Sequence, residues 1–356
     1  MTQLFSPLTI RNATFKNRIV VSSMCMYSST DGFANDWHLV HLGSRAVGGA
    51  ALIIQEATAV SAEGRISPGD LGIWKDEHVG KLQQIVSFIH DQNALAGIQL
   101  AHAGRKASCK VSWEGGAQIP SIAPGGWTSV APSDIPFAKG TEAPVALDEA
   151  GIEKIRCDFR LATKRAARVG YDVIEIHAAH GYLLHEFYSP LSNKRSDRYG
   201  GSFDNRVRLL LEVVQTVRLE WGDEKALFVR ISSTEWTDGG WTIEDSVKLS
   251  QLLKEFGVDL VDASSGGNVQ GAIIPTAPGY QVNFAEAIRK GTGIKTGAVG
   301  LITSAEQAEE VLSNDNADLI FLARELLRDP YFPLHAAKKL QHDVVWPVQY
   351  DRAKLK

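Results

Sequence analysis

The stretch IEKIRCDFRLATKRAARVGYDVIEI, residues 152–176, contains a helical pattern followed directly by a strand pattern. Apolar residues recur in its first part at three- and four-residue steps, as a helix that packs on a sheet requires. They are Ile152, Ile155, Phe159, Ala162, Ala166 and Val169. The last four residues, 173–176, are a short apolar run that predicts a buried strand. A helix leading into such a strand is the repeating unit of α/β folds.

The same alternation continues along the whole chain. Apolar runs of strand length occupy residues 18–21, 51–55, 96–100, 173–176, 227–231, 260–263, 295–299 and 318–322. Residues 207–221 form another clear amphipathic helix, for which Asp204 or Asn205 is the expected N-cap. Eight alternations predict a closed (β/α)8 TIM barrel. A doubly wound sheet is the alternative, but the G-x-G-x-x-G motif typical of it does not follow the first strand.

Two segments add to the bare barrel. Residues 8–15 (LTIRNATF) alternate around an Asn-Ala turn, which predicts an N-terminal β-hairpin closing the lower end of the barrel. Residues 107–146 are rich in Gly, Pro, Ser and Trp, and they predict a long loop after strand 3, on the catalytic face. No linker divides the chain, so we expect residues 1–356 to form a single domain.

Composition narrows the class of protein. The apolar fraction is 44% and the charged fraction 22%, as in a globular protein with a substantial core. A net charge of −4 gives no basic surface, so we expect neither nucleic acid nor an anionic membrane as a partner. The N-terminus lacks the pattern of a signal peptide. Three widely spaced cysteines, Cys25, Cys109 and Cys157, fit a reducing compartment, and we expect a cytoplasmic protein.

The segment HAAHGY, residues 177–182, follows the strand at 173–176 and would lie at the catalytic end of the barrel. A metal site would need a third ligand, for which His102 is the only candidate, and we therefore expect no metal. Structural hydrogen bonds alone could explain one histidine. Two histidines and Tyr182 together favour a pair of N–H donors that hold an anion or a carbonyl oxygen, with a phenol as proton donor.

Other strand ends indicate a phosphorylated cofactor across the barrel top. Arg230 lies at the inner end of a strand, where its charge is costly unless something negative or electron-rich faces it. An ion pair with Glu175 on the neighbouring strand is the alternative explanation. Residues 297–300 (GAVG) and the pair Ala323-Arg324 follow the last two strands, which is the usual phosphate site of these barrels.

With these residues assembled, the chain resembles the Old Yellow Enzyme family of FMN-dependent ene-reductases, especially its bacterial NADPH dehydrogenases and xenobiotic reductases. The likeness covers almost the whole chain. It is carried by KNRIVVSSMCMYS (16–28), GIQLAHAGRKA (97–107), DVIEIHAAHGYLLHEFYSPLSNKRSDRYGGSFDNR (172–206), TGAVGLIT (296–303), LIFLARELLRDP (319–330) and PVQYDR (347–352).

The resemblance implies a role for each matching position. It implies non-covalent FMN, with NADPH or NADH as reductant in a ping-pong reaction, and α,β-unsaturated carbonyl compounds (enones) as substrates. The implied catalytic residues are His177 and His180, which bind the carbonyl oxygen, Tyr182, the proton donor, and Cys25, which tunes the flavin. The implied FMN-binding residues are Ser22, Ser23, Met24, Cys25, Ala57, Gln99, Arg230, Gly300, Ala323 and Arg324. Substrate contacts fall to Tyr27, His177, His180, Tyr182 and Arg352.

The chain departs from the family pattern at two small residues. Ser23 stands where the family often has Pro, and Ala323 where it often has Gly. The resemblance also implies a homodimer or homotetramer, in which the C-terminal tail, residues 340–356, lies at the interface and Arg352 reaches a neighbouring subunit's site. The tail contains aromatic residues, a proline and an arginine. This composition is typical of an interface, whereas a frayed chain end is usually polar.

Two other functions remain open. A lyase or aldolase acting on a phosphorylated substrate would use a lysine at a strand end, but Lys295 begins its strand rather than ending it. A non-catalytic flavin-binding protein would not need the His177, His180 and Tyr182 set.

Overall fold

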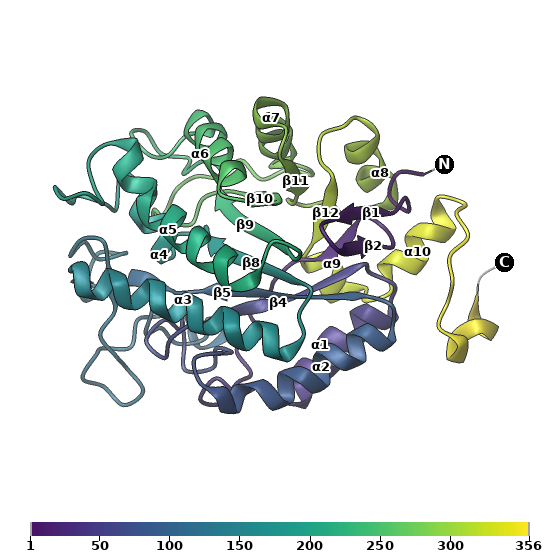
Figure 1. Ribbon diagram of the computed structural model, residues 1–356, viewed down its shortest axis with the longest axis horizontal. Coiled ribbons are helices and arrows are strands. Elements are labelled where there is room, and N and C mark those ends of the chain that lie inside the picture. The colour runs from purple at the N-terminus through teal and green to yellow at the C-terminus, as the bar shows by residue number, and fades with distance from the viewer. Residues whose placement is uncertain (1, 355–356) are drawn as a thin grey trace.

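Eight parallel strands close into one barrel in the computed structural model, which describes residues 2–354 (Figure 1). In order around the barrel they are β3 (Ile19–Val21), β4 (Leu52–Ala59), β5 (Leu95–Ala101), β8 (Val173–Ala178), β9 (Ala226–Ser232), β10 (Leu260–Ser264), β11 (Lys295–Ala298) and β12 (Leu319–Leu322). Each predicted apolar run overlaps one of these strands, so the expectation of a (β/α)8 barrel is confirmed.

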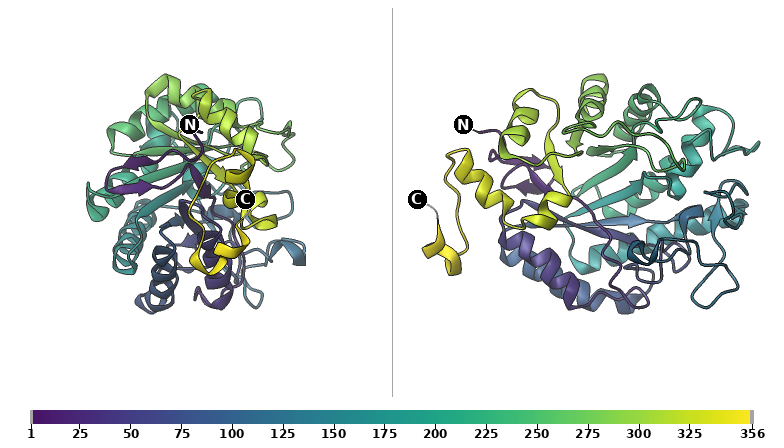
Figure 2. Two further views of the ribbon diagram at one scale, coloured as in Figure 1. Left: turned by 90° about the vertical axis from the view of Figure 1, so that its right-hand side faces the viewer. Right: turned by 180° about the vertical axis from the view of Figure 1, so that it is seen from behind.

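Helices surround the barrel on its outside (Figures 1 and 2). They are α1 (Asp36–Val47), α2 (Val79–Asp91), α3 (Glu149–Val169), α4 (Leu183–Tyr188), α5 (Phe203–Trp221), α6 (Ile243–Glu255), α7 (Val282–Thr292), α8 (Ala305–Ser313), α9 (Arg324–Arg328) and α10 (Phe332–Lys339). The predicted apolar stripe of α3 is buried along its whole length. The predicted N-cap of α5 is wrong. Ser202 caps that helix, because its backbone is extended and its Oγ accepts a hydrogen bond from Asn205 N.

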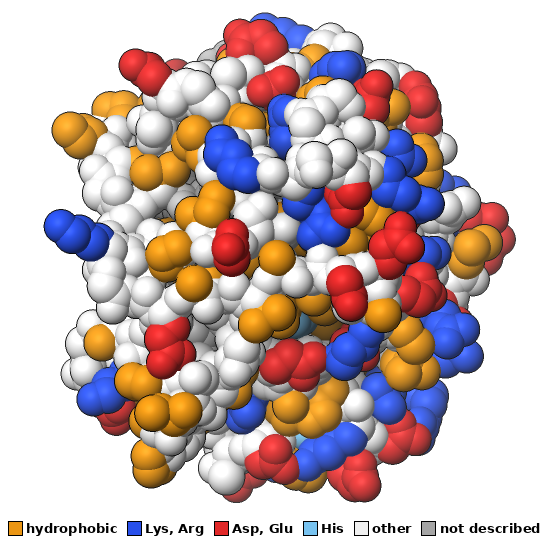
Figure 3. Space-filling view, turned by 90° about the vertical axis from the view of Figure 1, so that its left-hand side faces the viewer, with side chains coloured by type: hydrophobic (Ala, Val, Ile, Leu, Met, Phe, Trp, Pro, Cys, Tyr) orange, Lys and Arg blue, Asp and Glu red, His pale blue; other side chains and the backbone are white. Residues whose placement is uncertain are grey.

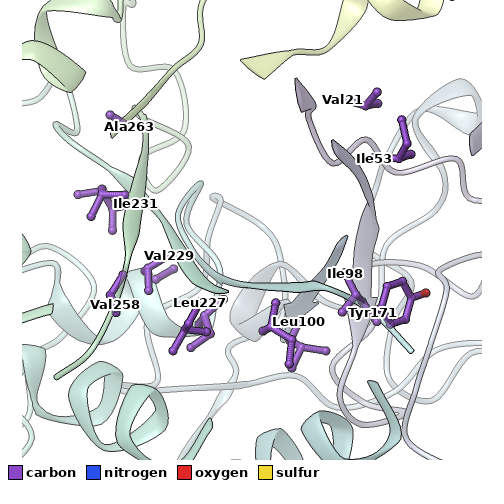
Figure 4. Packing of buried hydrophobic residues seen from close by; sticks show 14 of the residues in the cluster. Val21, Ile53, Ile98, Leu100, Tyr171, Leu227, Val229, Ile231, Val258 and Ala263 are labelled. Carbon is purple, nitrogen blue, oxygen red and sulfur yellow. The ribbon is translucent and has the colours of Figure 1, made fainter. Parts of the chain in front are cut away.

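The predicted N-terminal hairpin is confirmed. Strands β1 (Leu8–Ile10) and β2 (Ala13–Phe15) pair antiparallel and pack against the side chains inside the N-terminal end of the barrel, where Phe15 stacks on Phe228. A larger hydrophobic cluster fills the space between the strands and the surrounding helices (Figure 4). The two ends of the barrel therefore differ. Apolar packing closes the N-terminal end, and polar residues occupy the end that carries the carboxyl ends of the strands.

The loop at residues 107–146 follows β5 and extends from the end of the barrel that carries the carboxyl ends of the strands (Figure 1). It contains little regular structure: one 3-10 turn, η3 (Ser112–Glu114), and the short parallel pair β6 (Val130–Ala131) and β7 (Val145–Ala146). Arg105 Nη1 donates to the carbonyl of Ile135, 3.3 Å away, so the loop is tied to the end of β5.

The C-terminal tail leaves α10 and ends in a 3-10 segment, η4 (Val348–Ala353), at the same end of the barrel as the N-terminal hairpin and opposite to the long loop (Figures 1 and 2). Between the tail and the barrel is a groove of about 590 Å³, lined in part by Lys16, Asn17 and Trp346. Among residues 2–354 no helix combines the length and the apolar composition needed to cross a bilayer.

Candidate active site

The segment HAAHGY turns sharply as it leaves β8, and the turn brings three rings together. His180 and Gly181 both have left-handed backbone conformations, with φ of 57° and 73°. The His177 ring centroid lies 5.2 Å from that of His180 and 4.9 Å from that of Tyr182, both in edge-on geometry. The turn after His177 therefore makes the two imidazoles converge.

Three hydrogen bonds from outside the turn hold it in this left-handed backbone conformation, which residues other than glycine rarely adopt. The amide of His180 donates to Ser232 Oγ (2.9 Å), and its carbonyl accepts from Lys106 Nζ (2.9 Å). The amide of Gly181 donates to His185 Nδ1 (2.9 Å). Lys106 also donates to the carbonyl of Gly267 (3.0 Å), so it joins the loops after β8 and β10.

Both imidazoles of the turn are neutral. Burial lowers the pKa of His177 and of His180 well below the usual value, and the nearby charges of Arg230 and Lys106 lower both further. The amide of Ala179 donates to His177 Nδ1 (3.2 Å), so the hydrogen of this ring is on Nε2. His180 Nε2 lies 2.7 Å from Ser264 Oγ. Within residues 2–354, His177 Nε2 and His180 Nδ1 have no hydrogen-bond partner, which leaves one nitrogen of each ring for a ligand.

Tyr182 remains a neutral phenol. Burial raises its pKa well above the usual value, and the nearby Asp70 carboxylate raises it further. The ammonium of Lys106 lies 5.0 Å from the centre of its ring. A phenol that keeps its proton at neutral pH beside two N–H donors has the properties of a proton donor.

The interior of the barrel below these rings holds Arg230, and its ion-pair partner is not Glu175, the residue named as the alternative to a ligand. Arg230 Nε lies 3.1 Å from Asp262 Oδ2 on the adjacent strand β10, whereas Glu175 instead accepts from Gln99 Nε2 (2.7 Å). The reason is strand register, because Arg230 pairs with Asp262 across β9 and β10. Burial raises the pKa of both Glu175 and Asp262, and Arg230 opposes the rise.

The end of the first barrel strand contributes hydroxyl groups and a thiol. Arg230 Nη1 donates to Ser22 Oγ (3.0 Å) and Ser23 Oγ (3.3 Å). Met24 packs against the large hydrophobic cluster, and burial raises the pKa of the Cys25 thiol well above its usual value. A thiol with a raised pKa is protonated and is no nucleophile at neutral pH.

Tyr27 has a left-handed backbone, with φ of 49°, and its ring meets Trp113 of the long loop at 5.9 Å. The segment before it is anchored by Glu56, whose Oε2 accepts from Met26 N (2.9 Å). Burial raises the pKa of Glu56 to about 8. Ala57 follows Glu56 on β4 and is paired in register with Gln99 of β5.

A second hollow lies beside the ends of β11 and β12. It has a volume of about 170 Å³, and its lining includes Gly300, Ala323 and Arg324 together with Arg230. Gly300 has φ of 123°, a conformation that favours glycine, and a Cβ there would meet the Gln281 side chain at 3.1 Å. Arg230 thus connects this hollow to the barrel centre, as expected for a cofactor with a phosphate.

One expected residue lies elsewhere. Arg352 is exposed in η4, at the end of the barrel opposite to the HAAHGY turn (Figures 1 and 2). It takes no part in the site of its own chain. Figure 3 views the molecule from the catalytic end, where histidine surface shows only as small patches between other side chains.

Reasoning from the sequence assigned no role to Asp262, Lys106 and Ser264. Asp262 had a signal, because a carboxylate inside an otherwise apolar strand is costly without a partner. Lys106 and Ser264 act through contacts between distant loops, for which the sequence carries no local pattern. Among the described residues, no group of three His, Cys, Asp or Glu side chains could hold a metal ion.

Comparison with known proteins gives one family. Residues 3–343 match the NADH:flavin oxidoreductase / NADH oxidase family. The chain is 52% identical over 353 residues to an NADPH dehydrogenase of Geobacillus sp. (strain WCH70), covering 99% of this chain and 98% of the relative. It is 51% identical over 354 residues to an NADPH dehydrogenase of Bacillus cytotoxicus, covering 99% and 97%.

Solved structures agree with that result. Morphinone reductase is 27% identical with a TM-score of 0.80, and the match covers 96% of this chain and 91% of that one. The old yellow enzyme homologue from Zymomonas mobilis is 26% identical with a TM-score of 0.78, and the match covers 99% and 98%.

Proposed function

Because the chain belongs to the NADH:flavin oxidoreductase / NADH oxidase family, the family of Old Yellow Enzyme, we propose that it reduces the activated C=C bond of α,β-unsaturated carbonyl compounds. The chain is an oxidoreductase that uses FMN and a nicotinamide reductant. The proposal concerns the substrate class and the residues that handle it. Its main support is one observation: two neutral imidazoles and a protonated phenol converge, each imidazole with a nitrogen left for a ligand.

The residues present fit FMN. Arg230, Ser22, Ser23 and Gln99 gather polar groups at the barrel centre, where the oxygens and nitrogens of an isoalloxazine ring need partners. The hollow at Gly300, Ala323 and Arg324 could bind a phosphate through backbone N–H groups and the guanidinium of Arg324. Arg230 Nε is paired with Asp262 Oδ2, 3.1 Å away, so the guanidinium that would face the ring is held in place by a buried carboxylate. These residues would hold FMN, which would supply hydride transfer from the nicotinamide to the substrate β-carbon.

The imidazoles of His177 and His180 would donate to the substrate carbonyl oxygen. Negative charge grows on that oxygen as hydride reaches the β-carbon, so donors fixed in place stabilise the transition state more than the ground state. Neutral rings suit this role because each keeps one N–H to donate and does not change its charge at neutral pH. Tyr182 would then give its proton to the α-carbon.

Tyr27 and Cys25 would complete the site. We propose that Tyr27 contacts the substrate and that Cys25, a protonated thiol at the first strand end, tunes the flavin. Met24, Ala57 and Gln99 would line the isoalloxazine site. The contact of the left-handed Tyr27 with Trp113 supports a position of the long loop beside the proposed substrate pocket.

We further propose a homo-oligomer, a dimer or a tetramer, in which the tail completes a neighbour's site. The tail exposes Val345, Val348 and Tyr350, an apolar surface that a free monomer would leave in water. Arg352 lies too far from its own site to act there, so any contact it makes with substrate would be in a second subunit. We also propose that residues 1–356 are a single FMN-binding domain and that the protein is cytoplasmic, with its three cysteines unpaired.

The experiment that tests the proposed function is anaerobic turnover of NADPH by the FMN-loaded protein with 2-cyclohexenone. A lyase with a Schiff-base lysine is the competing function, and Lys106, whose pKa burial lowers to about 8, is the lysine that lies beside Tyr182. Its ammonium is already bonded to two carbonyls, which disfavours that role. A non-catalytic flavoprotein would not turn over NADPH with the enone.

A further inference from the structure

We propose that Ser264 is a positioning residue that sets the tautomer of His180, so that Nδ1 of this ring presents its hydrogen to the substrate oxygen. This inference rests on the proposed carbonyl-binding function of His180. It adds a residue to that site and assigns opposite tautomers to its two imidazoles.

The contact is short and enclosed. Ser264 is the last residue of β10, it is 4% exposed, and its Oγ lies 2.7 Å from His180 Nε2. Its backbone carbonyl accepts from Ser233 N (2.8 Å), which fixes the serine against the neighbouring strand end. Within residues 2–354, Ser264 Oγ makes no other hydrogen bond.

The described residues around Ser264 favour one direction of this hydrogen bond. If His180 Nε2–H donated to Ser264, the hydroxyl hydrogen would lack an acceptor among the described residues, and the Nδ1 lone pair would face the substrate oxygen. If the hydroxyl donates, Nε2 is the acceptor and the ring hydrogen is on Nδ1. Only this second arrangement gives the Ser264 hydroxyl hydrogen an acceptor and directs the Nδ1–H of His180 toward the substrate oxygen.

His177 of the same segment and His185 of α4 make a useful contrast. The amide of Ala179 donates to His177 Nδ1, and the amide of Gly181 donates to His185 Nδ1. A backbone N–H is always a donor, so both of these rings carry hydrogen on Nε2 whatever side chains surround them. His180 alone depends on a side-chain hydroxyl, and one substitution can therefore release its tautomer.

Ser264 could instead serve as an FMN ligand, because it lines the same hollow as Arg230 and Gly300. The two roles predict different results. A flavin ligand changes FMN retention when it is removed and leaves the imidazole unaffected. A residue that sets the tautomer changes the imidazole and leaves FMN in place.

The test is the nitrogen NMR spectrum of the FMN-loaded protein labelled with 15N-histidine, in which two-bond couplings identify the protonated ring nitrogen. His180 is assigned from the signals lost in His180→Asn. We expect hydrogen on Nδ1 of His180 and on Nε2 of His177 in the wild type and in Ser264→Thr. In Ser264→Ala the His180 signals should move to the Nε2–H form or to an average of both forms. Ser265→Ala, one residue further, should leave His180 unchanged.

Kinetics supply the second measurement. Ser264→Ala should slow flavin reoxidation by 2-cyclohexenone on the order of tenfold, less than the loss of a whole donor, and Ser264→Thr should restore most of the rate. Flavin reduction by NADPH should change less than the enone step.

Two results would overturn the proposal. One is a wild-type His180 with hydrogen on Nε2. The other is a Ser264→Ala protein that loses FMN while the His180 tautomer stays as it was, which would make Ser264 a cofactor ligand. The NMR result does not depend on turnover, so a protein that fails to reduce enones but has the expected tautomers would disprove the proposed function alone.

Discussion

The guanidinium of Arg230 lies 3.1 Å from the carboxylate of Asp262 inside the barrel, with Glu175 close enough to share in the same electrostatic cluster. Two buried acids therefore compete to neutralise one arginine. Because burial disfavours two negative charges there, we expect one acid to stay protonated and the other to balance Arg230.

This cluster predicts non-additive substitutions. Asp262→Asn or Glu175→Gln alone should cost about 1 kcal/mol of unfolding free energy, because the remaining acid ionises beside Arg230. The double variant leaves the guanidinium without a counter-charge and should cost about 3–5 kcal/mol. Urea unfolding of the four FMN-free proteins measures the coupling. Simple addition of the two single effects would mean that the acids do not substitute for each other.

Glu56 predicts a pH dependence of stability. Burial raises its pKa from 4.5 to about 8, so between these values the folded protein holds a proton that the unfolded chain has lost. The stabilisation is complete below pH 4.5 and falls as the pH rises toward 8. Glu56→Gln keeps an oxygen for Met26 N–H but has no proton to lose. Its stability relative to wild type should rise by about 1.4 kcal/mol per pH unit within this window.

The control for this prediction is Glu77→Gln, which changes an exposed glutamate. Its stability relative to wild type should be the same at pH 5 and pH 8. If the unfolding free energy of Glu56→Gln changes with pH just as that of the wild type does, Glu56 is not protonated in the folded protein between pH 4.5 and 8.

The imidazole pair predicts a selective kinetic defect. His177→Ala or His180→Ala should slow flavin reoxidation by 2-cyclohexenone by roughly tens- to a thousandfold, because each removes a donor to the developing charge. Flavin reduction by NADPH should suffer less. Stopped-flow absorbance separates the two steps, with the exposed His90→Ala as the matched control. Wild-type reoxidation rates in both variants would remove these residues from the substrate site.

The tail predicts a link between assembly and substrate binding. Removal of residues 347–356 should weaken the oligomer and raise the KM for enones while FMN stays bound. Arg352→Ala should raise the KM and leave the oligomer intact, because it removes the charge but keeps the apolar contacts. Sedimentation and steady-state kinetics measure both effects. A wild type that sediments as a monomer, or a monomeric truncation with unaltered KM, would contradict the proposed role.

The sequence predicted the barrel well because each strand and helix has its own local hydrophobic period. It also predicted that His177, His180 and Tyr182 lie together, since they follow one strand. The partner of Arg230 could not be predicted, because the choice between Glu175 and Asp262 depends on strand register. Lys106 and Ser264 were missed for a similar reason: each contacts His180 from another loop or strand end, and only the closed barrel brings them there.

The most direct test of the proposed ene-reductase activity is a double-mixing experiment without oxygen. The FMN-loaded protein is first mixed with one equivalent of NADPH, and 2-cyclohexenone is added after the flavin absorbance has bleached. We predict that the yellow absorbance returns in proportion to added enone, with cyclohexanone as the product. The contradicting result is a flavin that is bleached by NADPH and then stays reduced after 2-cyclohexenone or other activated enones are added.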